Sequence, residues 1–158
     1  WQRGDRVGTV LNFLSRKPAP VQPIAEPLTG LLQDFSLEVM PRSAAKIDSF
    51  VDILPAGSRV YVAHLDGTPI EDMIATAARI AREGFEVMPH LPARAIADRA
   101  MLNDWLARYS GEAGITQALL LGGGLSAPKG DFHSSMLLIE TGLLDAHGIT
   151  RLHVPWHP

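Results

Sequence analysis

Apolar residues along the chain follow two alternating patterns. Short apolar runs are separated by longer segments whose apolar residues are spaced three or four positions apart. The first pattern is typical of buried strands, and the second of helices that pack on one side. The short runs predict five strands, at residues 35–40, 59–64, 85–89, 117–121 and 151–154.

Helices are predicted between these strands. The pattern predicts four of them, at residues 43–54, 69–82, 95–109 and 134–144. Ser43 and Ser134 or Ser135 are typical helix-capping residues, and Pro69 is suited to the first turn of a helix. Because strands and helices alternate, we expect a parallel sheet with helices packed against it.

Two architectures fit this order of elements, an open doubly wound sheet and part of a (β/α)₈ barrel. Polar or glycine-rich residues lie at or after nearly every predicted strand: Glu38, His64, Asp66, His90, Gly122 to Gly124 and His157. In a barrel, all of these strand ends face one mouth. We therefore expect an incomplete (β/α) barrel of the TIM type, with about five parallel strands and four outer helices.

The first part of the chain differs from the rest. Four prolines fall between residues 18 and 27, and proline removes backbone donors and favours extended conformations. We expect residues 1–33 to form a proline-rich N-terminal arm and residues 34–158 to form the partial barrel domain.

Composition narrows the range of functions. A net charge of −3 argues against a nucleic-acid partner, and the lack of cysteine excludes disulfides, thiolate metal sites and a cysteine nucleophile. No apolar run approaches the roughly 18–20 residues of a membrane span, and no secretory signal is visible. We therefore expect a cytoplasmic protein that does not associate with membranes.

Four segments, taken in order, carry a resemblance to a known family. They are Phe35-Ser36-Leu37-Glu38-Val39-Met40-Pro41-Arg42, residues 85–94 with Met88-Pro89-His90-Leu91, residues 119–130 and residues 153–158. Together they resemble the methylenetetrahydrofolate reductases, which are flavin-containing (β/α)₈ barrels that reduce 5,10-methylenetetrahydrofolate to 5-methyltetrahydrofolate. The family has further strands beyond the matched region, so we expect only part of the barrel here.

The resemblance implies roles for particular residues. Glu38 matches the glutamate thought to protonate the folate. The implied flavin-binding residues are His64, Asp66, His90, Gly122, Gly123, Gly124, His133, Ser134 and His157. FAD would be the cofactor, NAD(P)H the reductant and folate the substrate. Gly122, Gly123 and Gly124 stand where many of these reductases have Arg-Gly-Asp.

Simpler interpretations exist for the same residues. Glu38 could form a salt bridge with Arg42 or Arg59, and the glycines could form a tight turn. Ser134 could serve simply as a helix cap. Two histidines and an aspartate are a weak signal for a metal site, and we predict none.

Three functions follow from these observations. The first is a flavin-dependent reductase of one-carbon metabolism. The second is a non-catalytic folate- or flavin-binding paralogue that acts as a partner subunit. In that case a second copy or another chain would cover the open sheet edge. The third is a different barrel enzyme that binds a phosphorylated metabolite at the glycine loop.

Overall fold

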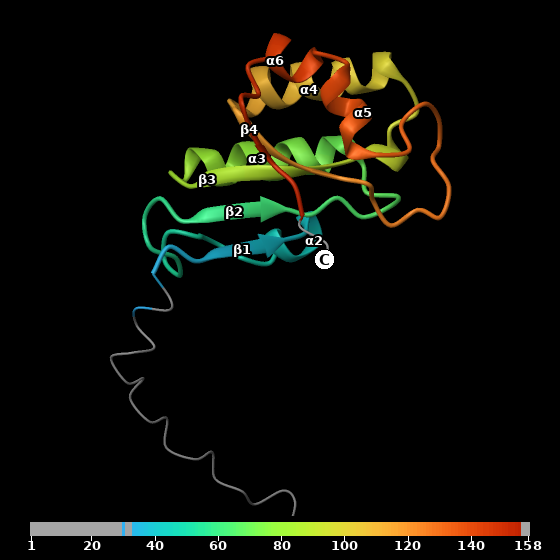
Figure 1. Cartoon of the computed structure of the whole chain (residues 1–158). Coiled ribbons are helices and arrows are strands. Elements are labelled where there is room, and N and C mark those ends of the chain that lie inside the picture. Colours follow the sequence, from blue (N-terminus) through green and yellow to red (C-terminus); the bar gives the residue numbers. More distant parts are fainter. Residues whose placement is uncertain (1–29, 31–32, 156–158) are drawn as a thin grey trace, which may run out of the picture. The chain divides into compact units, whose positions relative to one another are not determined.

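A computed structural model describes residue 30 and residues 33–155 (Figure 1). The chain divides into two units, Trp1–Gln33 and Asp34–Pro158, and the fold below is that of the second unit. The prolines of the predicted N-terminal arm lie outside the described residues.

Five parallel strands form the sheet (Figure 1). They are β1 (Ser36–Val39), β2 (Arg59–Val62), β3 (Glu86–Pro92), β4 (Gln117–Leu121) and β5 (Arg151–His153). Each strand pairs in parallel with the next one along the chain, so their order in the sheet is β1-β2-β3-β4-β5. The predicted α/β fold with a five-stranded parallel sheet is confirmed, and the sheet is open, with β1 and β5 at its edges.

This sequential order determines where the helices lie. A doubly wound sheet reverses its strand order at a switch point, whereas this sheet has no reversal. Connections between parallel strands are right-handed, so a sequential order places the connecting helices on one face. In the described part of the chain, the other face is left without a helical cover.

The helices differ widely in length. They are α2 (Pro41–Ala44), α3 (Ile70–Arg82), α4 (Arg99–Ala113), α5 (Ser135–Glu140) and α6 (Leu143–Ala146), with a 3-10 turn η1 (Ala93–Ala95). The two long helices pack side by side, and α3 also contacts β2 and β3 (Figure 1). No helix among the described residues is long and apolar enough to span a bilayer.

Alternate strand residues build the core. Successive side chains on a strand point to opposite faces of the sheet, and one set here is aliphatic: Leu37, Val39, Val60, Val62, Val87, Ala118 and Leu120. These residues share one apolar cluster with residues of the two long helices, among them Met73, Ile74, Ala77, Leu102 and Leu106. Burial of this face is the main favourable contribution to folding.

The helix predicted at residues 43–54 ends at Ala44. The Arg79 guanidinium of α3 donates to the Ala44 carbonyl oxygen at 3.1 Å and to two later carbonyls. Glu83 accepts from the Phe50 amide at 2.7 Å. These long-range bonds satisfy backbone groups that would otherwise need helical partners, which allows an irregular segment here.

The helix predicted at residues 134–144 is interrupted. Gly142 separates α5 from α6 and has a φ of 70°, a conformation that glycine adopts without strain. The Thr141 hydroxyl donates to the Leu138 carbonyl and accepts from the Leu143 amide, so it satisfies backbone groups at the break.

Candidate functional site

The sheet face without helices carries polar side chains. The alternation of the strands places on it the residues opposite in parity to the aliphatic core residues. Met88, Leu119 and Leu121 share this parity, and among its polar members we call the following set the polar face: Glu38, Arg59, Tyr61, Glu86, His90, Gln117 and His153. It draws residues from all five strands, so its composition depends on the whole sheet.

Glu38 and His90 are the predicted site residues that the structure brings together. The Oε2 atom of Glu38 on β1 lies 3.2 Å from Nε2 of His90 on β3. The His90 residue is only 8% exposed, whereas the Glu38 side chain is 58% exposed. Burial lowers the pKa of His90, and the Glu38 carboxylate opposes this effect. The alternative salt bridges from Glu38 to Arg42 or Arg59 do not form, and Arg59 instead pairs with Glu86 at 3.4 Å.

Tyr61 of β2 lies beside the same histidine. Its ring packs edge-on against His90, with centroids 6.2 Å apart, and edge-on against His153, with centroids 5.9 Å apart. The Tyr61 hydroxyl lies 3.2 Å from Nδ1 of His153 on β5. Tyr61 therefore joins the two histidines into one cluster.

The contact between Tyr61 and His153 shows that the sheet is curved. Neighbouring strands are about 4.8 Å apart, so β2 and β5 of a flat sheet would be about 14 Å apart. Their side chains would stand perpendicular to the sheet and would therefore not approach each other. Two side chains so far apart meet only if the sheet bends toward them. The polar face is therefore concave.

Burial and the neighbouring positive charges favour the neutral form of the His153 imidazole. Burial lowers the pKa of His153, and the positive charges of Arg59 and Arg151 lower it further, while Glu86 opposes them. A neutral imidazole has one ring nitrogen that accepts and one that donates. This state suits a hydrogen bond in which the Tyr61 hydroxyl donates to Nδ1.

Several buried polar atoms of the polar face lack hydrogen-bond partners among the described residues. They are Arg59 Nε, His90 Nε2, Gln117 Oε1 and His153 Nε2. The His90 atom lies close to Glu38, but the orientation of the two groups does not make a hydrogen bond. Buried polar atoms are usually paired, so four unpaired atoms on one face mark it as a place where further polar groups are needed.

His64 and Asp66 lie away from the polar face. The His64 ring stacks on Trp105 of α4, with centroids 5.0 Å apart. Burial is the main cause that lowers the pKa of His64, and the positive charge of Lys129 lowers it further. Asp66 pairs with Lys129 at 2.7 Å. The hydrogen bond and charge of that lysine lower the pKa of Asp66. These two predicted residues connect the loop after β2 to α4 and to the loop after β4.

The glycine loop folds over the end of β3. Gly122 accepts from the Arg94 amide at 3.0 Å. Gly123 has a φ of +88°, and a Cβ atom there would lie 3.0 Å from Cβ of Pro92. Gly124 has open space around it. Gly123 thus has a structural reason to be glycine, a Cβ at Gly122 would make only ordinary contacts with Arg94 at 3.9 Å, and Gly124 leaves room for close approach by another molecule.

The remaining predicted residues are separate from the polar face. His133 is exposed, and its carbonyl oxygen accepts from Arg94 Nε at 3.3 Å. Ser134 is the N-cap residue of α5, although its side chain makes no capping hydrogen bond. His157 lies outside the described residues. Within the described ranges, no three histidine, aspartate or glutamate residues are placed to hold a metal ion.

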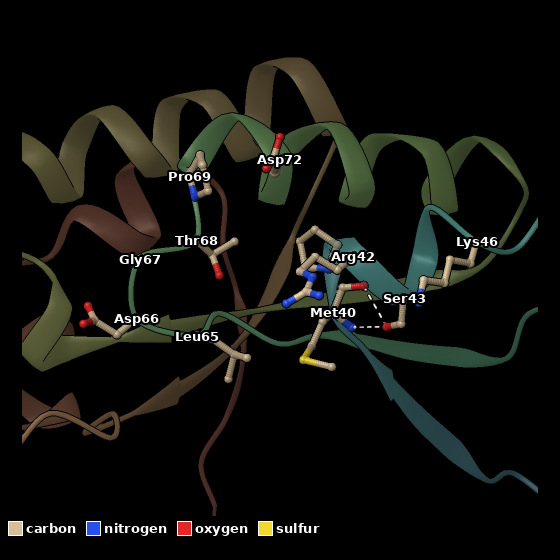
Figure 2. Close-up of a pocket in the computed structure, with 11 residues that line it drawn as sticks. Met40, Arg42, Ser43, Lys46, Leu65, Asp66, Gly67, Thr68, Pro69 and Asp72 are labelled. Atoms are coloured by element: carbon tan, nitrogen blue, oxygen red, sulfur yellow. Dashed lines mark hydrogen bonds between the residues drawn. The ribbon is translucent and has the colours of Figure 1, made fainter.

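A cavity of about 510 Å³ lies beyond the C-terminal ends of β1 and β2 (Figure 2). Arg42 and Thr68 point into this space, and Leu65 and Met40 border it (Figure 2). Of the predicted flavin-binding residues, Asp66 is part of its wall. None of the polar-face residues lines this cavity, which is bordered by α2, the loop after β2 and the start of α3.

No known protein-family model matches the chain. The resemblance to the methylenetetrahydrofolate reductases therefore rests on the segments themselves.

Sequence reasoning missed Tyr61 and His153 as site residues. Both belong to apolar strand runs and were assigned to the sheet alone. The signal that could have found them is parity, because Tyr61 alternates with the buried Val60 and Val62. A polar side chain on the face opposite the core is a candidate for the site wherever that face has no cover.

Proposed function

We propose that this chain belongs to a flavin-dependent oxidoreductase that resembles the methylenetetrahydrofolate reductases and acts in one-carbon metabolism. Its substrate would be 5,10-methylenetetrahydrofolate and its product 5-methyltetrahydrofolate. The sheet would be one arc of a (β/α) barrel of the TIM type. Both the sequential strand order and the concave helix-free face support this, because a barrel keeps sequential neighbours and curves in the same direction.

The observation that carries the proposal is the contact between Glu38 and His90. The resemblance gives Glu38 the role of proton donor to the folate, and a general acid must hold its proton near the operating pH. An imidazole 3.2 Å from the carboxylate can share that proton. Glu38 is also exposed enough to reach a substrate that covers the polar face.

Two features of the described residues support the proposal of a flavin. Its ring carbonyls and nitrogens need hydrogen-bonding partners, and the polar face has buried polar atoms without partners in the described chain. The open space at Gly124 allows close approach to the backbone. FAD, when bound, would supply the electron transfer between NAD(P)H and the folate. The chain's own residues would bind, orient and exclude water, and Glu38 would provide the proton.

The visible absorption spectrum tests this function. The purified chain would be mixed with FAD, freed of excess cofactor, and compared with a sample never exposed to FAD. The proposal predicts a retained flavin band in the first sample. A protein that stays colourless at every FAD concentration would reject it.

The open sheet supports a second candidate, a non-catalytic folate- or flavin-binding paralogue that acts as a partner subunit. Edge strands expose unpaired backbone groups, which invite pairing with another chain. Strands β1 and β5 are both such edges in the described sheet. This candidate predicts an assembly in sedimentation velocity measurements, with cooperative unfolding only in the assembled state. A cooperatively unfolding monomer would argue against it.

A further inference from the structure

Four side chains of the polar face form a continuous chain of contacts. Glu38 meets His90 at 3.2 Å, the His90 ring packs against Tyr61, and the Tyr61 hydroxyl meets His153 at 3.2 Å. The contacts run from β1 through β2 and β3 to β5. The resemblance assigns His90 to the flavin, and it assigns no role to Tyr61 or His153.

We propose that His90 is the proton partner of Glu38, and that Tyr61, fixed by its hydrogen bond to His153, is a positioning residue that holds the His90 ring against the carboxylate. This inference adds a proton partner and a positioning residue to the proposed function, and it rests on that function for the identity of the proton acceptor. The contacts among the four residues do not depend on that identity.

The proton balance is simple. The pair of Glu38 and His90 holds one proton between Oε2 and Nε2 in the competent state. That proton passes to the substrate nitrogen, which leaves a carboxylate and a neutral imidazole. Water reloads the pair through Glu38, whose side chain is 58% exposed. With the two groups 3.2 Å apart, the proposal assigns the proton to the pair rather than to either residue alone.

The orientation of Glu38 is the adjustable part of this arrangement. His90 Nε2 is buried and lacks a hydrogen bond among the described residues, although the carboxylate is close. Rotation of the exposed carboxylate completes the bond without moving the imidazole. The buried imidazole itself must be held in place, because an error of about 1 Å can reduce catalysis about 10²-fold.

Tyr61 is placed to hold the His90 imidazole in position. The ring contacts His90 at its edge, and the hydroxyl is fixed on the far side of the concave face by His153. Burial, Arg59 and Arg151 act against a charge on His153, and Glu86 acts in favour of one. Burial, the charge of Lys129 and then the charge of His90 lower the pKa of His64, so His90 also faces that histidine. The neutral His153 remains an acceptor for the Tyr61 hydroxyl.

Histidine NMR of the full chain tests this inference without flavin or folate. Imidazole signals would be followed from about pH 5 to about pH 8, the range in which histidine titrates. The proteins are the unmutated chain, Glu38→Gln, Tyr61→Phe and the double variant. His147 is the internal control, because it lies on the surface next to Asn103, with Nε2 and Oδ1 2.9 Å apart.

We expect Glu38→Gln to lower the apparent pKa of His90, because the negative charge that stabilises its protonated form is lost. Tyr61→Phe should change the Nδ1 signal of His153 and make the response of His90 to Glu38→Gln smaller. His147 should respond to neither substitution. The change in the His90 pKa caused by Glu38→Gln is compared between the chain with Tyr61 and the chain with Tyr61→Phe. The difference between these two changes is a coupling energy, which measures whether Tyr61 acts through the pair of Glu38 and His90.

Two results would overturn the inference. The first is a His90 titration that does not change in Glu38→Gln. The second is an equal response to Glu38→Gln with and without the Tyr61 hydroxyl. If the coupling is found but flavin never binds, the positioning inference stands and the reductase function fails. If flavin binds and the coupling is absent, the reverse holds.

Discussion

The two faces of the sheet differ in what they contribute. The helix-covered face is aliphatic, and its residues are buried against α3 and α4 in one cluster. The polar face is concave, mixes charges with aromatic rings and leaves buried polar atoms unpaired within the described chain. The first face is built for stability and the second is not, which is the pattern expected where binding or chemistry takes place.

The largest effect should come from the helix-covered face. Leu106 on α4 has no exposed surface. Leu106→Ala should lower the free energy of unfolding by about 2–5 kcal/mol, since it removes buried methyl groups and leaves a cavity. Urea denaturation measures this loss. Leu65, 54% exposed on the loop after β2, is the control. Leu65→Ala should stay within about 0.5 kcal/mol, and equal losses at both positions would contradict the packing described.

The glycine loop should show a smaller effect that differs between adjacent residues. Gly123→Ala should lower stability by about 1–2 kcal/mol, because alanine is strained at positive φ and Pro92 is close. Gly124→Ala has open space and no such φ, so it should be nearly neutral. The same urea measurements compare the two variants. If Gly124→Ala were the more damaging one, the geometry of the loop would be wrong.

The two tyrosines of the chain lie on opposite sides of the sheet, and removal of their hydroxyls should affect stability differently. Tyr61→Phe should cost about 1 kcal/mol, since it removes a hydrogen bond to His153. Tyr109 is buried on the helix-covered side, and its hydroxyl has no partner among the described residues. Tyr109→Phe should therefore be neutral or stabilising. Thermal unfolding of both variants checks this sign difference, and a larger loss for Tyr109→Phe would refute it.

The smallest effect concerns pH. Burial lowers the pKa of both His90 and His64. Below the ordinary histidine pKa of about 6.5, the unfolded chain therefore binds more protons than the folded one. Stability should be complete above that pH and fall as the pH drops below it. Urea denaturation at about pH 7.5 and about pH 5.5 measures the difference. His90→Gln should reduce this pH dependence, and a dependence of the opposite sign would contradict the burial of these rings.

Local patterns predicted the strands well, because each strand has one aliphatic face. β4 has the predicted bounds at Gln117–Leu121. The pattern failed for the helix predicted at residues 43–54, where Arg79 and Glu83 bind the backbone from a distant helix. Contacts between residues so far apart along the chain leave no trace in local periodicity.

The site was predictable only in part. Glu38 and His90 stood out as polar residues in apolar runs, and the parallel order of strands brought them together. His64 and Asp66 were predicted to lie with them, but the segment after β2 turns toward Trp105 and Lys129 instead. Tyr61 and His153 meet because of sheet curvature, which the sequence pattern does not encode.

The proton step assigned to Glu38 can be measured directly by rapid kinetics. With FAD bound and oxygen excluded, the flavin would first be reduced by NAD(P)H and then mixed with 5,10-methylenetetrahydrofolate, while flavin absorbance is followed in time. We expect rapid reoxidation in the unmutated chain. In Glu38→Gln the same step should be about 10²- to 10⁴-fold slower, with reduction by NAD(P)H unaffected. Reoxidation at an equal rate in both proteins would contradict this assignment.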